Sequence, residues 1–165
     1  MLELRAAQLS DLEQIRAIYN DAILTTVATF DTELKSQEDR VRWLCERDEN
    51  FPVWVAVENT TVLGYAALSK WSERKAYSIT AEVSLYVEVS NRGKGIGKLL
   101  LKAIIKRAIE ATKLHSIIAR ISEGNEQSVH LHEMNGFKLM GVMKEAGSKF
   151  GKLHSVSFMQ KMLRE

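Results

Sequence analysis

The stretch Thr80–Lys102, TAEVSLYVEVSNRGKGIGKLLLK, decides how the rest of the chain can be arranged. Its first half alternates apolar and polar residues, which predicts a strand. One side carries Val83, Leu85, Val87 and Val89, and the other carries Glu82, Ser84, Tyr86 and Glu88. The second half changes to a helical period, carried by Ile96, Leu99, Leu100, Ala103 and Ile104. The stretch therefore predicts a strand, a turn and a helix in succession.

A glycine-rich turn, Arg92-Gly-Lys-Gly-Ile-Gly97, joins the predicted strand to the predicted helix. Glycines let the backbone approach a ligand closely, and the free N–H groups at a helix start carry partial positive charge. Lys94 and Lys98 add cationic side chains at the same place. The turn therefore predicts a phosphate or pyrophosphate site at Arg92–Lys98.

Two well-known glycine loops do not fit this turn. A Walker loop ending at Gly97-Lys98 would need glycine at position 92, which is Arg, and Ser or Thr at 99, which is Leu. A dinucleotide fingerprint starting at Gly93 would need Gly or Ala at position 98, which is Lys. The remaining pattern, Arg-x-x-Gly-x-Gly after a strand, belongs to neither class.

Composition limits the class of protein. The chain has 165 residues, 45% of them hydrophobic and 27% charged, which suits a single domain spanning 1–165. The net charge of +2 gives no reason to expect a nucleic-acid partner. The single cysteine, Cys45, fits a reducing compartment, and we expect it to be a buried packing residue. Without a visible signal peptide or an apolar run of about 18 residues, we expect a cytoplasmic protein with no membrane partner.

Seven strands and four helices are predicted along the chain. Strands are expected at 2–5, 51–57, 62–71, 77–89, 115–121, 137–144 and 153–162, with a turn at 147–151. Helices are expected after the capping boxes at Ser10 and Ser36, at 96–111 and at 125–135. Hairpin strands with interspersed crossover helices indicate a mixed α/β (α+β) sheet.

The glycine turn resembles the pyrophosphate-binding signature of the GNAT N-acetyltransferases, and a second stretch resembles the helix beside their pantetheine arm. That stretch begins at Asn125 and Ser128 and ends at Gly136-Phe137, with His132 where the family usually has Tyr. The order of elements also matches the GNAT fold, a mostly antiparallel seven-stranded sheet flanked by about four helices. The resemblance implies acetyl-CoA as co-substrate and no metal.

Within that family the chain resembles the phosphinothricin and methionine-sulfoximine acetyltransferases. The resemblance lies at Ile18–Ala22, Thr29-Phe30, Trp43, Trp71, Ala76-Tyr77, Ala81–Ser84, Leu131-His132 and Gly147–Gly151. It implies acetyl transfer to the amine of a small amino-acid-like substrate and a homodimer. One position departs from the subgroup, because Ser72 stands where an Arg usually follows the aromatic residue.

The resemblance assigns cofactor contacts to the strand, the turn and the later helix. These residues are Leu85, Tyr86, Val87, Arg92, Gly93, Lys94, Gly95, Ile96, Gly97, Lys98, Asn125 and Ser128. The acceptor is assigned to Phe30, Trp71, Arg74 and Tyr77, with Arg74 as the cation for a carboxylate. Core packing or a surface salt bridge is the alternative for each of these four.

Two side chains are predicted to take part in catalysis. Glu82 lies on the polar side of the strand that leads into the glycine turn, and is the predicted base that takes the amine's proton. The alternative is a solvated strand glutamate. His132 is predicted to steady or protonate the leaving thiolate, and the alternative is a helix histidine packed against the sheet. His130 and His132 are two residues apart on a helix and so do not face one metal.

The sequence therefore predicts an acetyl-CoA-dependent N-acetyltransferase acting on a small amine. Two alternatives remain at this point. The same fold could acetylate a protein or peptide, which would need a peptide-wide groove. It could also be a non-catalytic module that binds acyl-CoA, in which case Glu82→Gln would have no effect.

Overall fold

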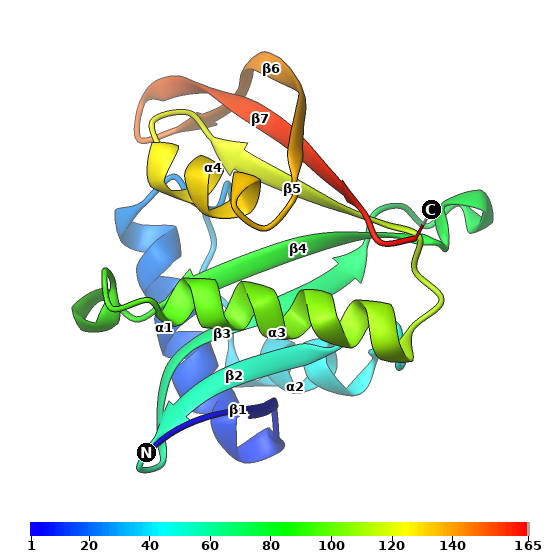
Figure 1. Cartoon of the computed structure of the whole chain (residues 1–165). Coiled ribbons are helices and arrows are strands. Elements are labelled where there is room, and N and C mark those ends of the chain that lie inside the picture. Colours follow the sequence, from blue (N-terminus) through cyan, green and yellow to red (C-terminus); the bar gives the residue numbers. More distant parts are fainter. Residues whose placement is uncertain (165) are drawn as a thin grey trace.

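Within residues 1–164, which the computed structural model describes, strands and helices follow one another in the predicted order (Figure 1). The elements are β1 Leu2–Ala6, α1 Leu12–Thr25, α2 Gln37–Cys45, β2 Val53–Glu58, β3 Thr61–Lys70, β4 Thr80–Val87, α3 Ile96–Ala111, β5 Ser116–Ser122, α4 Glu126–Glu133, β6 Lys138–Lys149 and β7 Lys152–Met162. Short 3-10 turns lie at Leu9–Asp11, Lys75–Tyr77 and Val89–Asn91.

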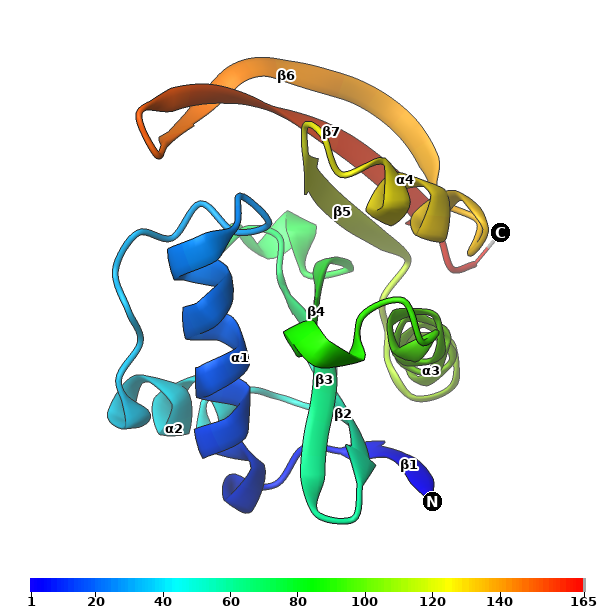
Figure 2. The ribbon, with the colours of Figure 1, turned by 90° about the vertical axis from the view of Figure 1, so that its left-hand side faces the viewer.

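The strands form one sheet in the order β1-β2-β3-β4-β5-β7-β6. Neighbouring strands are antiparallel except β4 and β5, which are parallel. Over the described range, β4 pairs with β5 only at Thr80–Glu82, opposite Ser116–Ile118. Beyond Glu82 the two strands separate, as Figure 2 shows. The predicted mixed, mostly antiparallel fold is confirmed.

Helices cover both faces of the sheet (Figure 2). On one face α1 and α2 pack over β2 and β3, and Leu12 and Ile15 are fully buried there. On the other face α3 buries Leu100 and Ile104, and α4 adds Leu131 at the margin of the same core. Because side chains alternate along a strand, β4 can serve both cores. The alternation predicted for β4 is therefore explained by its packing on both faces of the sheet.

The helix starts differ in how well the sequence predicted them. The capping box at Ser36 is present, since the Ser36 hydroxyl accepts a hydrogen bond from the backbone of Asp39 and the Asp39 carboxylate accepts one from Ser36. The box predicted at Ser10 is wrong. Instead the Asp11 carboxylate accepts from the backbone N–H of Gln8 at 2.7 Å and from Arg5.

Three other sequence predictions are corrected by the structure. The strand expected at 77–89 is only Thr80–Val87, because both of its ends wind into 3-10 turns and leave Val89 58% exposed. The turn expected at 147–151 shortens to Phe150-Gly151, since β6 continues through Lys149. Cys45 is exposed at the end of α2 rather than buried.

Candidate active site

A cavity of about 870 Å³ lies where β4 and β5 separate. Its walls come from α1, the α1–α2 loop, α2, β3, β4, β5, α4 and β7. Because β4 is bonded to β3 on its other edge, residues Val83–Val87 keep one edge free of β5 in the described part of the chain. Leu85 and Tyr86 line the cavity, whereas Val87 packs at the margin of the α3 core. A ligand could therefore pair with the free edge of β4 as a strand would.

The glycine turn has the conformation that the sequence predicted for an anion site. Gly93 and Gly95 have φ angles of 75° and 83°, a left-handed conformation that favours glycine. No side chain caps the start of α3 among the described residues, and Leu99 makes the first helical bond, to Gly95. The N–H groups of Ile96, Gly97 and Lys98 therefore have no partner inside the helix.

Two cationic side chains of the turn are fixed by local contacts. Arg92 donates from Nε to the Val87 carbonyl at 3.1 Å, and Lys94 donates to the Asn91 side chain at 3.2 Å. Both residues and Lys98 are exposed. The turn thus combines free backbone donors with positive charge, which suits a pyrophosphate.

The first turn of α4 forms another wall of the cavity. Asn125 caps the helix, since its side-chain oxygen accepts from the Ser128 N–H at 3.2 Å, and both residues line the cavity. His132 lies one turn further, is buried, and has the edge of Phe137 against its ring. The predicted cofactor residues of α4 are thus adjacent to the predicted catalytic histidine.

The hydrogen bond of His132 fixes which ring nitrogen carries the proton. Nδ1 lies 2.7 Å from the Ser128 carbonyl oxygen, which can only accept, so Nδ1 is the donor. Burial lowers the pKa of His132, and the bond to Ser128 opposes that shift only in part, so the ring is neutral at pH 7. A neutral ring with its proton on Nδ1 has no N–H at Nε2. This geometry favours an accepting role for Nε2 over protonation of a thiolate.

Glu82 stands at the point where the two strands part. It is the last residue of β4 that pairs with β5, opposite Ile118, and its side chain lines the cavity. Arg120 holds the carboxylate with two hydrogen bonds of 2.7 Å, from Nε to Oε1 and from Nη2 to Oε2. The guanidinium also lies 5.8 Å from the centre of the Trp71 ring. The predicted base is thus oriented by a partner that the sequence analysis did not identify.

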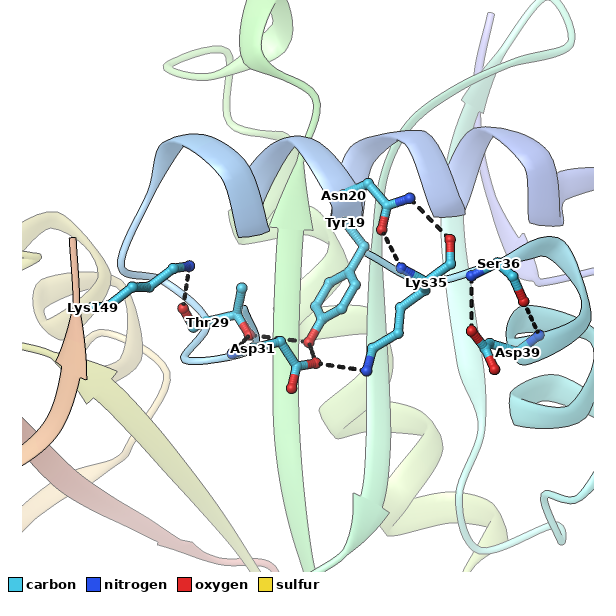
Figure 3. A network of polar contacts seen from close by, with 8 residues as sticks. All are labelled: Tyr19, Asn20, Thr29, Asp31, Lys35, Ser36, Asp39 and Lys149. Carbon is cyan, nitrogen blue, oxygen red and sulfur yellow. Dashed lines mark hydrogen bonds and ion pairs between the residues drawn. The ribbon is translucent and has the colours of Figure 1, made fainter. Parts of the chain in front are cut away.

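A polar network holds the α1–α2 loop, which forms another wall of the cavity, against α1 (Figure 3). The Tyr19 hydroxyl donates to Asp31, lies 3.0 Å from the Thr29 hydroxyl, and Lys35 pairs with Asp31 at 3.3 Å. Burial and the acceptor Asp31 raise the pKa of Tyr19 to about 12, so the phenol stays protonated at neutral pH. Burial alone would raise the pKa of Asp31, but Tyr19 and Lys35 outweigh it and hold that pKa below its usual value.

The same loop is anchored from the far end of the chain. Lys149, on β6, donates to the carbonyl oxygen of Thr26 at 2.8 Å. It also donates to the carbonyl oxygen of Thr29 at 2.9 Å, as Figure 3 shows. Phe30 packs against Gly147, where a Cβ atom would lie 2.2 Å from the phenyl ring. The β6–β7 hairpin therefore fixes where Phe30 enters the cavity.

The predicted acceptor residues are only partly brought together. Phe30 lines the cavity, but among the described residues that form its walls Trp71, Arg74 and Tyr77 do not appear. Trp71 packs edge-on against Phe158, and Arg74 and Tyr77 are exposed at the 3-10 turn before β4. Sequence reasoning missed several lining residues: Tyr19, Asp31, Arg40, Trp43 and Arg120. The sequence analysis used Tyr19 and Trp43 for the subgroup resemblance but assigned neither of them to a site.

Comparison with known proteins identifies the fold and the chemistry. The model of the acetyltransferase (GNAT) domain family matches residues 4–155. The chain belongs to the GNAT acetyltransferase family. It is similar to the L-methionine sulfoximine/L-methionine sulfone acetyltransferase of Pseudomonas paraeruginosa, with 39% identity over 159 residues that cover 95% of this chain and 92% of the relative. Other relatives are named phosphinothricin N-acetyltransferases, so the predicted subgroup is confirmed.

Solved GNAT structures superpose closely on this one. A putative acetyltransferase from Salmonella typhimurium, determined with acetyl-CoA, has a TM-score of 0.96 and 34% identity, covering 100% of this chain and 95% of its own. A ribosomal-protein-alanine N-acetyltransferase from Brucella melitensis has a TM-score of 0.93 and 39% identity, covering 97% and 99%. The protein is therefore an N-acetyltransferase of the GNAT family and uses acetyl-CoA, as the sequence predicts.

The GNAT co-substrate fits the glycine turn and the free edge of β4. The free donors at Ile96–Lys98 suit its pyrophosphate, and the free edge of β4 suits its amide-containing arm. None of the helices within residues 1–164 is long and apolar enough to cross a membrane. In that same range, no group of three or more His, Cys, Asp or Glu is arranged to hold a metal ion.

Proposed function

We propose that this GNAT protein transfers the acetyl group of acetyl-CoA directly to the α-amino group of a small amino-acid-like acceptor, of the methionine sulfoximine or phosphinothricin type. The observation that carries the proposal is that one cavity is lined by Asn125 and Leu85 on the predicted cofactor side, by Phe30 and Asp31 of the α1–α2 loop, and by Glu82. The names of the similar relatives support the acceptor class.

In the proposed reaction the acceptor nitrogen attacks the thioester carbonyl carbon, a C–N bond forms, and the C–S bond breaks to release coenzyme A. Glu82 accepts the proton that the ammonium group loses, directly or through a water molecule. The backbone of Leu85–Val87 holds the pantetheine arm and polarises the thioester carbonyl. At pH 7 deprotonation costs about 1.4 kcal/mol for an amine of pKa ~8 and about 4.6 kcal/mol for a lysine-like amine of pKa ~10.4.

A thiol-release assay tests this proposal. Acetyl-CoA is offered with methionine sulfoximine, phosphinothricin, common amino acids, polyamines, aminoglycosides and short peptides. We expect release with one or more amino-acid-like acceptors and little with polyamines or aminoglycosides. Tight binding of coenzyme A with no release above background for any acceptor would overturn the proposal and favour a non-catalytic module.

A second candidate acceptor is the N-terminus of a protein. The similarity to the Brucella melitensis ribosomal-protein-alanine N-acetyltransferase favours it. The same panel separates the two, because this candidate predicts acetylation of short peptides and none of free amino acids.

We also propose that residues 1–165 form one domain, which acts as a cytoplasmic homodimer. The single sheet supports one domain, and the single cysteine suits a reducing compartment. The apolar residues of β6 support the dimer, because this edge strand exposes Leu139, Met140, Val142 and Met143. Trp71, Arg74 and Tyr77 remain proposed acceptor contacts.

A further inference from the structure

The pair formed by Glu82 and Arg120 leaves much of its hydrogen-bonding capacity unused. An arginine has five N–H donors, and Glu82 takes one from Nε and one from Nη2. Across the described residues, no other hydrogen bond of the Arg120 side chain is formed. Two donors on Nη1 and one on Nη2 therefore remain, on the edge of the guanidinium that Glu82 does not occupy.

That unused edge has the geometry of a carboxylate receptor. The Nη1 and Nη2 atoms of a guanidinium can bind a carboxylate through two parallel hydrogen bonds. Glu82 and the Trp71 ring already restrict how Arg120 can turn, so less side-chain freedom is lost when an anion binds. Because Arg120 is 52% exposed and lines the cavity, an anion can reach it.

The two charges of the pair are close together and opposite in sign, as are those of an α-amino acid. Building on the proposed function, we infer that Glu82 and Arg120 together form the receptor for the acceptor's α-amino and carboxylate groups. Glu82 receives the ammonium group and takes its proton, while the free edge of Arg120 binds the carboxylate. Each carboxylate oxygen of Glu82 accepts only one bond from Arg120, which leaves lone pairs for the ammonium group.

The other cations are less suitable for this task. Arg74, which the sequence analysis assigned to a carboxylate, is exposed at the 3-10 turn before β4 and is not among the described residues that line the cavity. Lys35 is neutralised by Asp31 at 3.3 Å. Arg40 is only 5% exposed and lies between the rings of Tyr19 and Trp43, at 4.3 and 4.8 Å from their centres. Arg120 is the cation that touches the proposed base itself.

The unmodified protein gives the first test. An amino acid found to be acetylated is compared with its carboxamide, which keeps the α-amino group and removes the negative charge. We expect kcat/KM to be about 10- to 100-fold higher for the amino acid, the range that a charged hydrogen-bonded pair supplies. Equal values for the two acceptors would overturn the inference and leave the proposed function standing, whereas failure of all acceptors would overturn the function.

The second test uses Arg120→Gln, with Arg107→Gln on α3 as the matched control outside the cavity. Coenzyme A binding by calorimetry shows that each variant is folded. We expect Arg120→Gln to reduce kcat/KM about 10- to 100-fold for the amino acid and less than about threefold for the carboxamide, with the control unchanged. Equal losses for both acceptors would mean that Arg120 only positions Glu82. If the preference for the amino acid over its carboxamide were retained in Arg120→Gln but lost in Arg40→Met, the carboxylate would bind at Arg40. Either result overturns the inference.

Discussion

At the scale of single residues, the alternation of β4 was enough to place Glu82 on the polar side of the strand, and its side chain lines the cavity. Its partner was not predictable, because Arg120 is 38 residues further along the chain and meets Glu82 only where two parallel strands begin to part. His132 shows the same limit. Its position on α4 could be expected, but the bond to the Ser128 carbonyl that selects its tautomer could not.

Replacing Glu82 by Gln keeps the shape of the side chain and removes the proton acceptor. We expect kcat to fall by about 10²- to 10⁴-fold, the usual contribution of a general base, while coenzyme A binding is unchanged. As the pH approaches the pKa of the acceptor amine, a larger fraction of the amine is already deprotonated and needs no base. The deficit in kcat should therefore shrink. Steady-state rates between pH 6 and about 10, together with calorimetry, measure both effects.

The control for this prediction is Glu58→Gln, since Glu58 is an exposed strand glutamate at the end of β2, outside the cavity. It should behave as the unmodified protein at every pH. A deficit in Glu82→Gln that stays constant across the pH range would contradict the base role and point to lost orientation of Arg120.

At the scale of elements, β4 and α3 were predicted closely because each has a clear hydrophobic period. The predicted ends of β4 were wrong, because the residues on both sides form 3-10 turns, which have no such hydrophobic period. The α1–α2 loop was expected to be irregular, but its position depends on Lys149, Ser122 and Gly147, all of which come much later in the chain. A local pattern cannot predict contacts of that range, and for this reason the wall of the cavity that this loop forms was the least well predicted.

The glycine turn before α3 supplies a prediction at this scale. Gly95→Val places a β-branched residue at φ 83°, which costs at least about 1–2 kcal/mol in the left-handed region and reorients the N–H groups at the helix start. We expect coenzyme A binding to be lost by calorimetry while the circular dichroism spectrum is kept. Open space around the Cβ position in the described part of the chain means that strain, and not a clash, is the cause.

Gly141→Val is the matched control. Gly141 lies in β6, its Cβ position also has open space around it among the described residues, and its φ angle is not positive. It should bind coenzyme A as the unmodified protein does. Unchanged binding by Gly95→Val would mean that the turn does not contact the co-substrate.

At the scale of the whole molecule, the proposed homodimer rests on the apolar side chains that β6 exposes at the edge of the sheet. Two of these apolar residues, Val142 and Met143, are 52% and 50% exposed. Val142→Lys would place a charge in the proposed dimer contact. We expect the unmodified protein to have twice the 18.7 kDa mass of one chain in light scattering, and this variant to have the mass of one chain.

Leu9→Lys serves as the control, since Leu9 is an exposed apolar residue before α1, and it should leave the mass unchanged. An unmodified protein with the mass of a single chain at micromolar concentration would contradict the proposed homodimer.

The contact of Lys149 with the α1–α2 loop also bears on the order in which the enzyme is assembled. The two carbonyl oxygens that accept its hydrogen bonds belong to residues 123 and 120 positions earlier, and Phe30 needs Gly147 as its packing partner. Contacts of such long range form only when the distant segments meet. During synthesis the α1–α2 loop therefore lacks both of these anchors until residues 147–149 have left the ribosome. The wall of the cavity that this loop forms is thus completed only with the last hairpin.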